Sequence, residues 1–264
     1  METLLLTRGH PFEREPFFAM LDGVFEGLGE YAHVEHPAAP YALAPEPLAA
    51  FSRVLCYDMP GIRFQSGGPE YALPPSELPG WFDAATERGV GFVFLHHALA
   101  GWPAWPDYAE LLGGRFCYTP QRLRGEAVQD SGYRHGVTHR LRKLREHPVT
   151  AGIPDSFEMT DELYLCEVFE DDVTPLLASD YEFVADNFYS AARVVVDGRM
   201  YDNEGWQHAP GSSLVGWTRT VRNSRIVYLQ GGDDPVAYAN EHYQRLLANA
   251  LRWVEQPVLT GHTA

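Results

Sequence analysis

Four short apolar runs occur in the first part of the chain, and each has the length of a β-strand. They cover residues 3–7, 31–36, 53–58 and 91–95. Runs of this length, rich in Leu, Val or aromatic residues and bounded by polar or turn-forming positions, are typical of strands inside a sheet. The pattern therefore predicts four strands.

Between these runs, apolar residues recur at helical spacing. Residues 13–28 form one such stretch, and residues 76–88 form another, which Gly89 can end with a left-handed cap. Residues 59–75 are rich in Gly and Pro and are expected to form a long surface loop. Strands that alternate with helices predict a mostly parallel sheet with right-handed connections and helices on both faces.

The region 115–201 departs from this alternation. It contains short strand-like pieces, such as residues 163–169 and 192–197. Because these pieces do not continue the alternation of strands and helices, we expect antiparallel strands and loops added to the sheet.

The regular pattern returns at the end of the chain. Residues 213–220 and 225–230 predict two more strands, and a helix with an apolar stripe is expected to start near Asn240. We expect an α/β fold in one domain over residues 1–264, with an inserted β-rich region at about 115–201.

Composition narrows the classes of function. The chain is 45% hydrophobic with a formal net charge of −16, which favours a folded protein without general affinity for nucleic acid or anionic membranes. The apolar run in METLLLTRGHPF is too short for a signal peptide or a membrane span. The three widely spaced cysteines suggest no disulfide framework. We therefore expect a cytoplasmic protein, and the formation of a homo-oligomer stays open.

Polar side chains follow four of the predicted strands. In open α/β sheets, ligands bind beyond the carboxyl ends of the strands, so these side chains are expected to converge on one site. The alternative is that they cap helices and satisfy loops. The residues concerned are His10, Asp58, His96 with His97, and Gln230 with Asp233 and Asp234.

His96 and His97 form the expected centre of the site. Imidazole titrates near neutral pH and binds zinc-like metals, so either residue can serve as general base, oxyanion donor or metal ligand. Adjacent residues of an extended chain point to opposite sides, and at least one imidazole is expected to face a crevice. The alternative is one buried core histidine and one exposed histidine.

Asp161, Glu162 and Tyr164 lie in a strand-like segment. Strand alternation lets Glu162 reach inward with Tyr164 while Asp161 stays out. A carboxylate beside histidines suits acid–base chemistry or a mixed His/carboxylate metal site. A solvated acidic turn is the alternative.

Other motifs are weaker or absent. Trp102, in the aromatic loop after the two histidines, can provide a stacking wall for a sugar or seal the loop onto the next helix. His135 and His139 have i,i+4 spacing but lack the Glu of H-E-x-x-H. The chain has no P-loop, dinucleotide fingerprint or G-x-S-x-G elbow, so no nucleotide cofactor is expected.

Three segments together resemble the ThuA-like, or trehalose-utilisation, family. They are GFVFLHHALAGWPAWPDYAELLGGRF, HPVTAGIPDSFEMTDELY and RIVYLQGGDDPVAYANEHYQRLLANALRW. The resemblance runs through nearly the whole chain. It implies a flavodoxin-like three-layer sandwich related to class I glutamine amidotransferases, without their catalytic cysteine.

The resemblance also implies site residues. Where relatives have a G-H-D or G-H-E turn after the last strand, this chain has Gly232-Asp233-Asp234, so Asp233 replaces a histidine. The family's strand-end histidine, its histidine after the fourth strand and its D/E-E-x-Y element fall on His10, His96, Asp161, Glu162 and Tyr164.

These observations support three hypotheses. The first is a carbohydrate enzyme that acts on a sugar or keto-sugar by acid–base chemistry with His96, His97 and Glu162. In this hypothesis a divalent metal such as zinc, held by His10 and His96, can assist the reaction. The residues expected to bind substrate are His10, Asp58, Trp102, Tyr164, Gln230 and Asp233. The second is a non-catalytic amidotransferase-like module that binds a carbohydrate or a protein partner. The third is a metal-dependent hydrolase.

Overall fold

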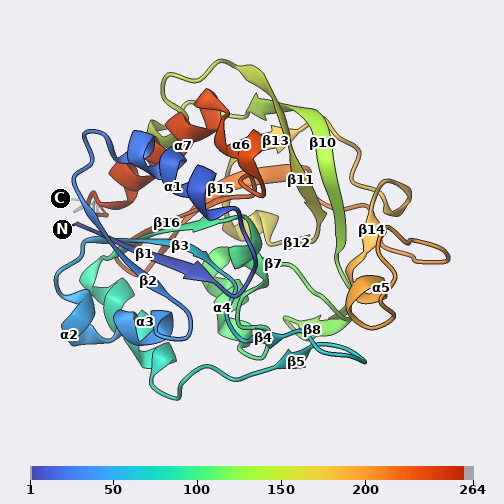
Figure 1. Ribbon diagram of the computed structural model, residues 1–264. Helices are drawn as coiled ribbons and strands as arrows, with labels where there is room; N and C mark the ends of the chain where they lie inside the picture. The colour runs from blue at the N-terminus through green and yellow to red at the C-terminus, as the bar shows by residue number, and fades with distance from the viewer. Residues whose placement is uncertain (1, 259–264) are drawn as a thin grey trace.

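A computed structural model describes residues 2–258, in which ten strands form one large sheet (Figure 1). The parallel half has the order β2-β1-β3-β6-β16. In order of appearance along the chain this is 2-1-3-4-5, the flavodoxin-like arrangement. The expected fold class is confirmed. These strands span Tyr31–Glu35, Thr3–Arg8, Arg53–Asp58, Gly91–Leu95 and Ser224–Leu229.

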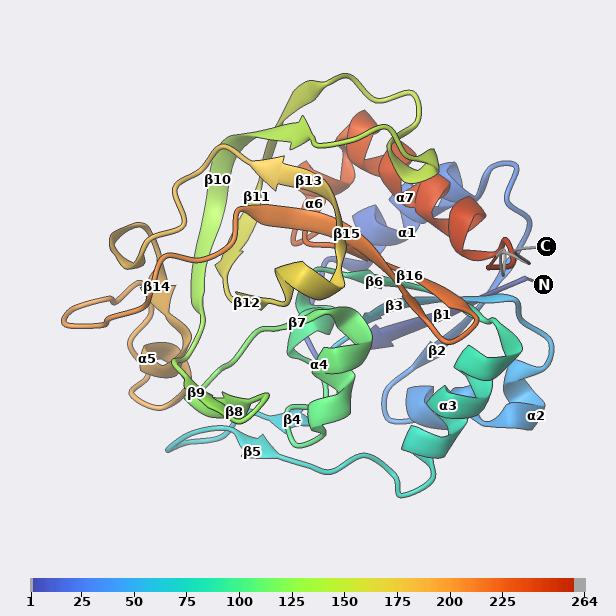
Figure 2. The same cartoon turned by 180° about the vertical axis from the view of Figure 1, so that it is seen from behind.

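The other half of the sheet is antiparallel. It continues from β16 through β15, β13, β10 and β11, and β14 pairs with β10. Figure 2 shows this half on the side of the molecule away from α2 and α3. The added antiparallel strands expected in the middle of the chain are therefore present. Within residues 115–201 these are β13 (Thr174–Ser179), β10 (Gly132–Lys143), β11 (Ser156–Leu165) and β14 (Tyr189–Ser190), and β15 spans Leu214–Val221 further along the chain.

Helices cover both faces of the parallel half, which makes three layers. Leu5 and Leu55 pack in one core with α1 (Arg14–Phe25) and α7 (Glu241–Val254). Leu4 and Val54 point the other way and pack in a second core with α3 (Leu78–Arg88) and α4 (Pro106–Leu112). Strand alternation thus produces the two cores.

One expectation for the middle region is wrong. Residues 192–197 were expected to be strand-like, but α5 (Ala191–Val195) occupies most of them. Two acceptors start this helix: the Ser190 hydroxyl accepts the N–H of Arg193, and the Asp130 carboxylate accepts the N–H of Ala192. These caps outweigh the strand preference of three consecutive valines.

Shorter elements connect the layers. The expected loop 59–75 contains a small hairpin. Within residues 2–258, no helix is long and apolar enough to cross a membrane. The short strands are β4 (Ile62–Arg63), β5 (Glu70–Tyr71), β7 (Gly114–Arg115), β8 (Gln121–Leu123), β9 (Glu126–Val128) and β12 (Glu167–Val168). The short α-helices are α2 (Pro45–Leu48) and α6 (Pro235–Tyr238), and the 3₁₀ turns are η1 (Ala39–Leu43), η2 (His96–Ala100), η3 (Pro148–Thr150), η4 (Glu170–Asp172) and η5 (Ala185–Asn187).

Candidate functional site

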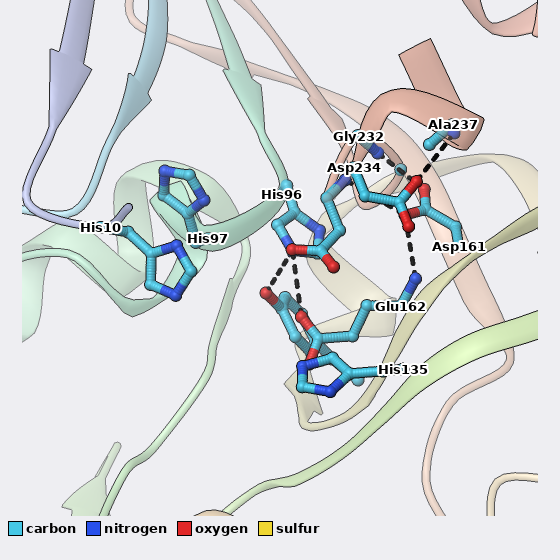
Figure 3. A network of polar contacts seen from close by, with 12 residues as sticks. His10, His96, His97, His135, Asp161, Glu162, Gly232, Asp234 and Ala237 are labelled. Atoms are coloured by element: carbon cyan, nitrogen blue, oxygen red, sulfur yellow. Dashed lines mark hydrogen bonds and ion pairs between the residues drawn. The ribbon is translucent and has the colours of Figure 1, made fainter. Parts of the chain in front are cut away.

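His96 is the first residue after β6, and its side chain is fully buried. Its backbone φ of 46° lies in the left-handed region, which residues with a side chain rarely adopt. Strained backbone of this kind clusters at functional sites. The turn brings His96 to a network of polar contacts between the end of β16 and β11 (Figure 3).

The contacts of His96 define its tautomer. Nδ1 lies 2.7 Å from the carbonyl oxygen of Gln230, which can only accept a hydrogen bond, so Nδ1 carries a proton. Nε2 faces Glu162 Oε2 at 3.1 Å, the Tyr164 hydroxyl at 2.7 Å and Asp233 Oδ1 at 3.3 Å. Two carboxylates around this nitrogen favour a proton or another cation between them.

A β-bulge brings His135 to the same carboxylate. The pairing of β10 with β11 shifts between Arg134 and Val137, so His135 lies opposite Glu162. Nε2 of His135 is 2.8 Å from Oε1 of Glu162. Glu162 therefore joins His96 to His135.

Burial opposes charge on these groups, but their hydrogen bonds outweigh it. Burial raises the pKa of Glu162, yet hydrogen bonds from His135 and His96 lower that pKa to about 2. Burial lowers the pKa of His96, yet hydrogen bonds to Asp233 and Glu162 raise it well above its ordinary value. The hydrogen bond to Glu162 also raises the pKa of His135. At neutral pH the cluster thus contains an ionised Glu162 and a protonated His96.

Asp161 is buried, so the expectation that it stays out is wrong. Its carboxylate accepts the backbone N–H groups of Gly232, Asp233 and Glu162 at 2.7, 3.1 and 2.9 Å. Buried N–H donors in the turn after β16 need an acceptor, which explains why the side chain points inward. Burial raises the pKa of Asp161 to about 7. The side chain fixes the turn that holds Asp233 beside His96.

His10 and His97 form a pair of rings next to this cluster. Their centroids are 4.7 Å apart, and the ring of His97 also contacts Tyr57. Burial lowers the pKa of both imidazoles, and the neighbouring His96 lowers each further, so both favour the neutral form. His10 lines a pocket that opens over Glu162, whereas His97 is buried behind His10 and does not line that pocket.

Two residues expected to bind substrate lie away from the network. Asp58 Oδ2 is 2.8 Å from Nε2 of His36, and Trp102 is buried against Gly61. Neither residue lines the pocket. Gln230 belongs to the network, because its backbone carbonyl oxygen accepts a hydrogen bond from Nδ1 of His96. Its side-chain oxygen accepts the backbone N–H of Tyr164.

A pocket of about 550 Å³ opens over Glu162. This volume is within the range of small-molecule sites. Glu162 and Tyr164 are buried at its inner end beside the half-buried His10, whereas the side chain of His135 is 42% exposed, and the rest of the lining is mostly apolar. The other lining residues are Pro11, Phe64, Gln65, Phe116, Tyr118, Tyr133, Ala191, Val194, Val195 and Met200.

His96, Glu162 and Asp233 could also hold a metal ion. One ligand atom from each lies within 4.8 Å of the others. An imidazole with two carboxylates suits a divalent cation such as zinc, and the carbonyl on Nδ1 is the outer contact that metal-bound histidines usually have. His10, expected to share a metal with His96, is not in this group, and its Nδ1 lies 2.8 Å from the Pro11 carbonyl oxygen.

The role of His135 and of most of the aromatic lining is not evident from the sequence. The i,i+4 spacing of His135 and His139 is only a weak metal signal, and in the structure His139 Nδ1 contacts the Ser179 hydroxyl at 2.8 Å and His139 does not line the pocket. The alternation of Tyr133 and His135 along one strand is the available signal. It does not reveal which strand lies beside them.

Known proteins share this fold. Residues 73–254 match the family model ThuA, described as trehalose utilisation. A ThuA-like protein from Parabacteroides merdae superposes with a TM-score of 0.65 at 17% identity, over 97% of this chain and 90% of that chain. For a ThuA-like protein from Bacteroides uniformis the TM-score is 0.62 at 18% identity, over 96% and 91%.

A Salmonella typhimurium protein described as cytoplasmic has a TM-score of 0.58 at 10% identity, over 96% of this chain and 99% of that chain. Similarities at these low identities show the fold alone. No curated protein matches the sequence. The family model, however, covers more than half of the chain, and the chain therefore belongs to the ThuA family.

Proposed function

We propose that this protein is an enzyme of carbohydrate metabolism that acts on a sugar or keto-sugar by His/Glu acid–base chemistry. The observation that carries the proposal is the cluster of His96, Glu162 and His135, in which Glu162 and His135 line the pocket and the buried His96 contacts Glu162. Removing such charges from water is unfavourable unless they are paired, and perturbed pKa values cluster at functional sites. The family description, trehalose utilisation, supports a carbohydrate as the substrate class.

The inner end of the pocket suits a sugar ring. Tyr164 and Phe116 offer aromatic surface, with centroids 4.6 Å apart, against which the C–H face of a sugar can pack. His10, His135 and Glu162 provide hydrogen-bonding groups for the hydroxyl or carbonyl oxygens. The pocket therefore combines the two kinds of surface that a sugar presents.

For a keto-sugar, the residues support proton abstraction next to the carbonyl. The neutral imidazole of His10 accepts the proton, the electron pair of the broken C–H bond forms the C=C bond of an enolate, and the π pair of the carbonyl moves onto its oxygen. The hydrogen bond to Glu162 raises the pKa of His135, which favours its protonated form, and this imidazole donates to the enolate oxygen. For isomerisation, His135 gives its proton to that oxygen, the hydroxyl on the deprotonated carbon returns a proton to His135 as it becomes the new carbonyl, and the former carbonyl carbon takes the proton from His10. For elimination, the carbonyl forms again, and the substituent on the carbon beyond the deprotonated one leaves with its bonding pair and the proton from His10. The outcome is isomerisation or elimination.

Other residues position these groups. His97 packs against His10, and Asp161 holds the turn that carries Asp233. A divalent cation held by His96, Glu162 and Asp233 would polarise the substrate carbonyl as a Lewis acid. We also propose a cytoplasmic location, supported by three free cysteines among the described residues and by the description of the Salmonella protein.

Turnover of keto derivatives of trehalose and of simple glucosides, followed by NMR, tests the proposal. We expect wild-type turnover and a loss of at least about 100-fold in Glu162→Gln. Glu158→Gln is the matched control, because Glu158 lies on the same strand and is exposed. Binding without turnover by the wild-type protein would favour the non-catalytic module instead, and full activity of Glu162→Gln would contradict the assigned chemistry.

A further inference from the structure

The outer half of the pocket is mostly apolar, and two exposed apolar side chains line its mouth. Eight large hydrophobic residues are exposed in the described part of the chain, and five of them lie in the segments 59–75 and 191–202. Phe64 and Met200, from these two segments, line the pocket although they are 48% and 53% exposed. A concentration of exposed apolar surface at a pocket marks a binding surface.

One wall of the pocket is a continuous series of aromatic rings. It starts at Tyr164, whose ring lies 4.7 Å from the buried ring of His96, and it ends at Phe64 on the surface. From Tyr164 through Phe116 and Tyr118 to Phe64, successive ring centroids are 4.6, 5.0 and 5.0 Å apart. The wall therefore connects the charged inner end to the apolar mouth.

The hydroxyl groups of this lining are engaged within the protein. Tyr164 contacts His96, Tyr118 donates to the sulfur of Met59, and the hydroxyl of Tyr133 accepts the N–H of Tyr201. The lining thus presents mainly ring surface to the pocket.

Another part of the lining is aliphatic. It consists of Ala191, Val194 and Val195 of α5 together with Met200. The exposed polar side chains of the lining are Gln65 and His135. His135 is directed at Glu162, 2.8 Å away, so most of the outer half is apolar.

This division restricts what can be attached to a bound sugar. A second hexose in the outer half would exchange the water around its hydroxyls for apolar walls, which is unfavourable without compensating hydrogen bonds. An aromatic or aliphatic group would instead bury apolar surface, at roughly 25 cal/mol per Å².

We propose that the outer half of the pocket binds an apolar aglycone, so that the preferred ligands are glycosides of aromatic or aliphatic alcohols instead of disaccharides. The assignment rests on the proposed function, because it takes the inner end as the site of the sugar. Phe64, Val195 and Met200 are then the residues that determine specificity.

Calorimetric titration with methyl glucoside, phenyl glucoside of the same anomeric configuration, and trehalose tests the inference. We expect phenyl glucoside to bind at least about tenfold more tightly than either of the others. Phe64→Ser and Val195→Ser should each reduce that preference at least about threefold, with the affinity for methyl glucoside unchanged. The matched controls are Leu73→Ser and Val196→Ser, whose residues are exposed on the same segments but do not line the pocket.

Parallel assays with the keto derivatives separate this inference from the proposed function. A phenyl preference that disappears in the two pocket variants supports the apolar subsite, even if no keto-sugar is turned over and the catalytic proposal fails. Equal affinities for methyl glucoside and phenyl glucoside overturn the proposal of an apolar subsite, even if the keto derivatives of both glucosides are turned over. Tighter binding of trehalose also overturns it. A Val195→Ser variant that keeps the phenyl preference and changes only the self-association of the chain, measured by sedimentation, overturns it as well.

Discussion

Glu162 and His135 form an ion pair at 2.8 Å inside the antiparallel half of the sheet, where a bulge in β10 sets His135 opposite the carboxylate. The second oxygen of the same carboxylate faces His96, which follows a parallel strand. One carboxylate thus stabilises positive charge on two imidazoles that come from different parts of the chain.

Replacing His135 should weaken the acidity of Glu162. In His135→Asn the carboxyl loses its hydrogen bond to the imidazole, so its pKa should rise from about 2 toward the ordinary range. NMR titration of a selectively labelled glutamate side chain measures this change. His208→Asn is the control, because His208 contacts a loop carbonyl and lies outside the pocket. An unchanged titration of Glu162 would contradict the role of His135.

Asp161→Asn should destabilise the fold. An amide in place of the carboxylate turns one acceptor into a donor, and at least one of the three backbone N–H groups loses its partner. We expect a decrease of about 1–3 kcal/mol in the free energy of unfolding, measured in urea. Asp234→Asn should change stability by less than about 0.5 kcal/mol, because Asp234 caps α6 and asparagine caps equally well. Equal effects of the two changes would contradict the assignment.

His139 should make the stability of the protein depend on pH. Burial lowers its folded-state pKa to about 4, whereas the unfolded chain has the ordinary value of about 6.5. The unfolded state therefore binds more protons between these values, and stability falls as the pH decreases through this window. The loss from this residue should be about 2 kcal/mol between pH 7 and pH 5. Urea unfolding at both pH values should show a smaller difference in His139→Gln than in the wild type or in His208→Gln.

Asp233 should control metal affinity. If the group formed by His96, Glu162 and Asp233 binds zinc, Asp233→Asn removes a charged ligand and should weaken binding at least about tenfold in calorimetric titration. Asp234→Asn is the neighbouring control and should bind zinc as the wild type does. The same affinity in both variants would show that Asp233 is not a ligand.

The fold follows from the sequence because local patterns specify it. Apolar strands with alternating inward residues, the helices around Phe17 and Leu247, and the Gly89 cap all act within a few positions of the chain. The exception is residues 192–197, where caps supplied by Asp130 and Ser190 start a helix. Asp130 is distant in sequence, so its effect cannot be read from the segment itself.

The candidate site is less accessible to sequence reasoning. His10, His96 and Glu162 are identified from their positions after or within strands, and the structure brings them together. The ion pair of His135 depends on a register shift, and the inward position of Asp161 depends on donors in a turn far along the chain. Both arise from pairing between distant segments, which a single sequence does not specify.

The charged cluster lies at the junction of the two halves of the sheet. His96 and Asp233 come from the parallel half, whereas Glu162 and His135 come from the antiparallel half. Each half supplies one histidine–carboxylate pair, and the contact between His96 and Glu162 joins the two pairs, so the complete cluster forms only when both halves are folded. Because the antiparallel half supplies Glu162, His135 and part of the pocket lining, a different antiparallel half on the same parallel half would change the ionisable residues and the ligand that the pocket accepts together.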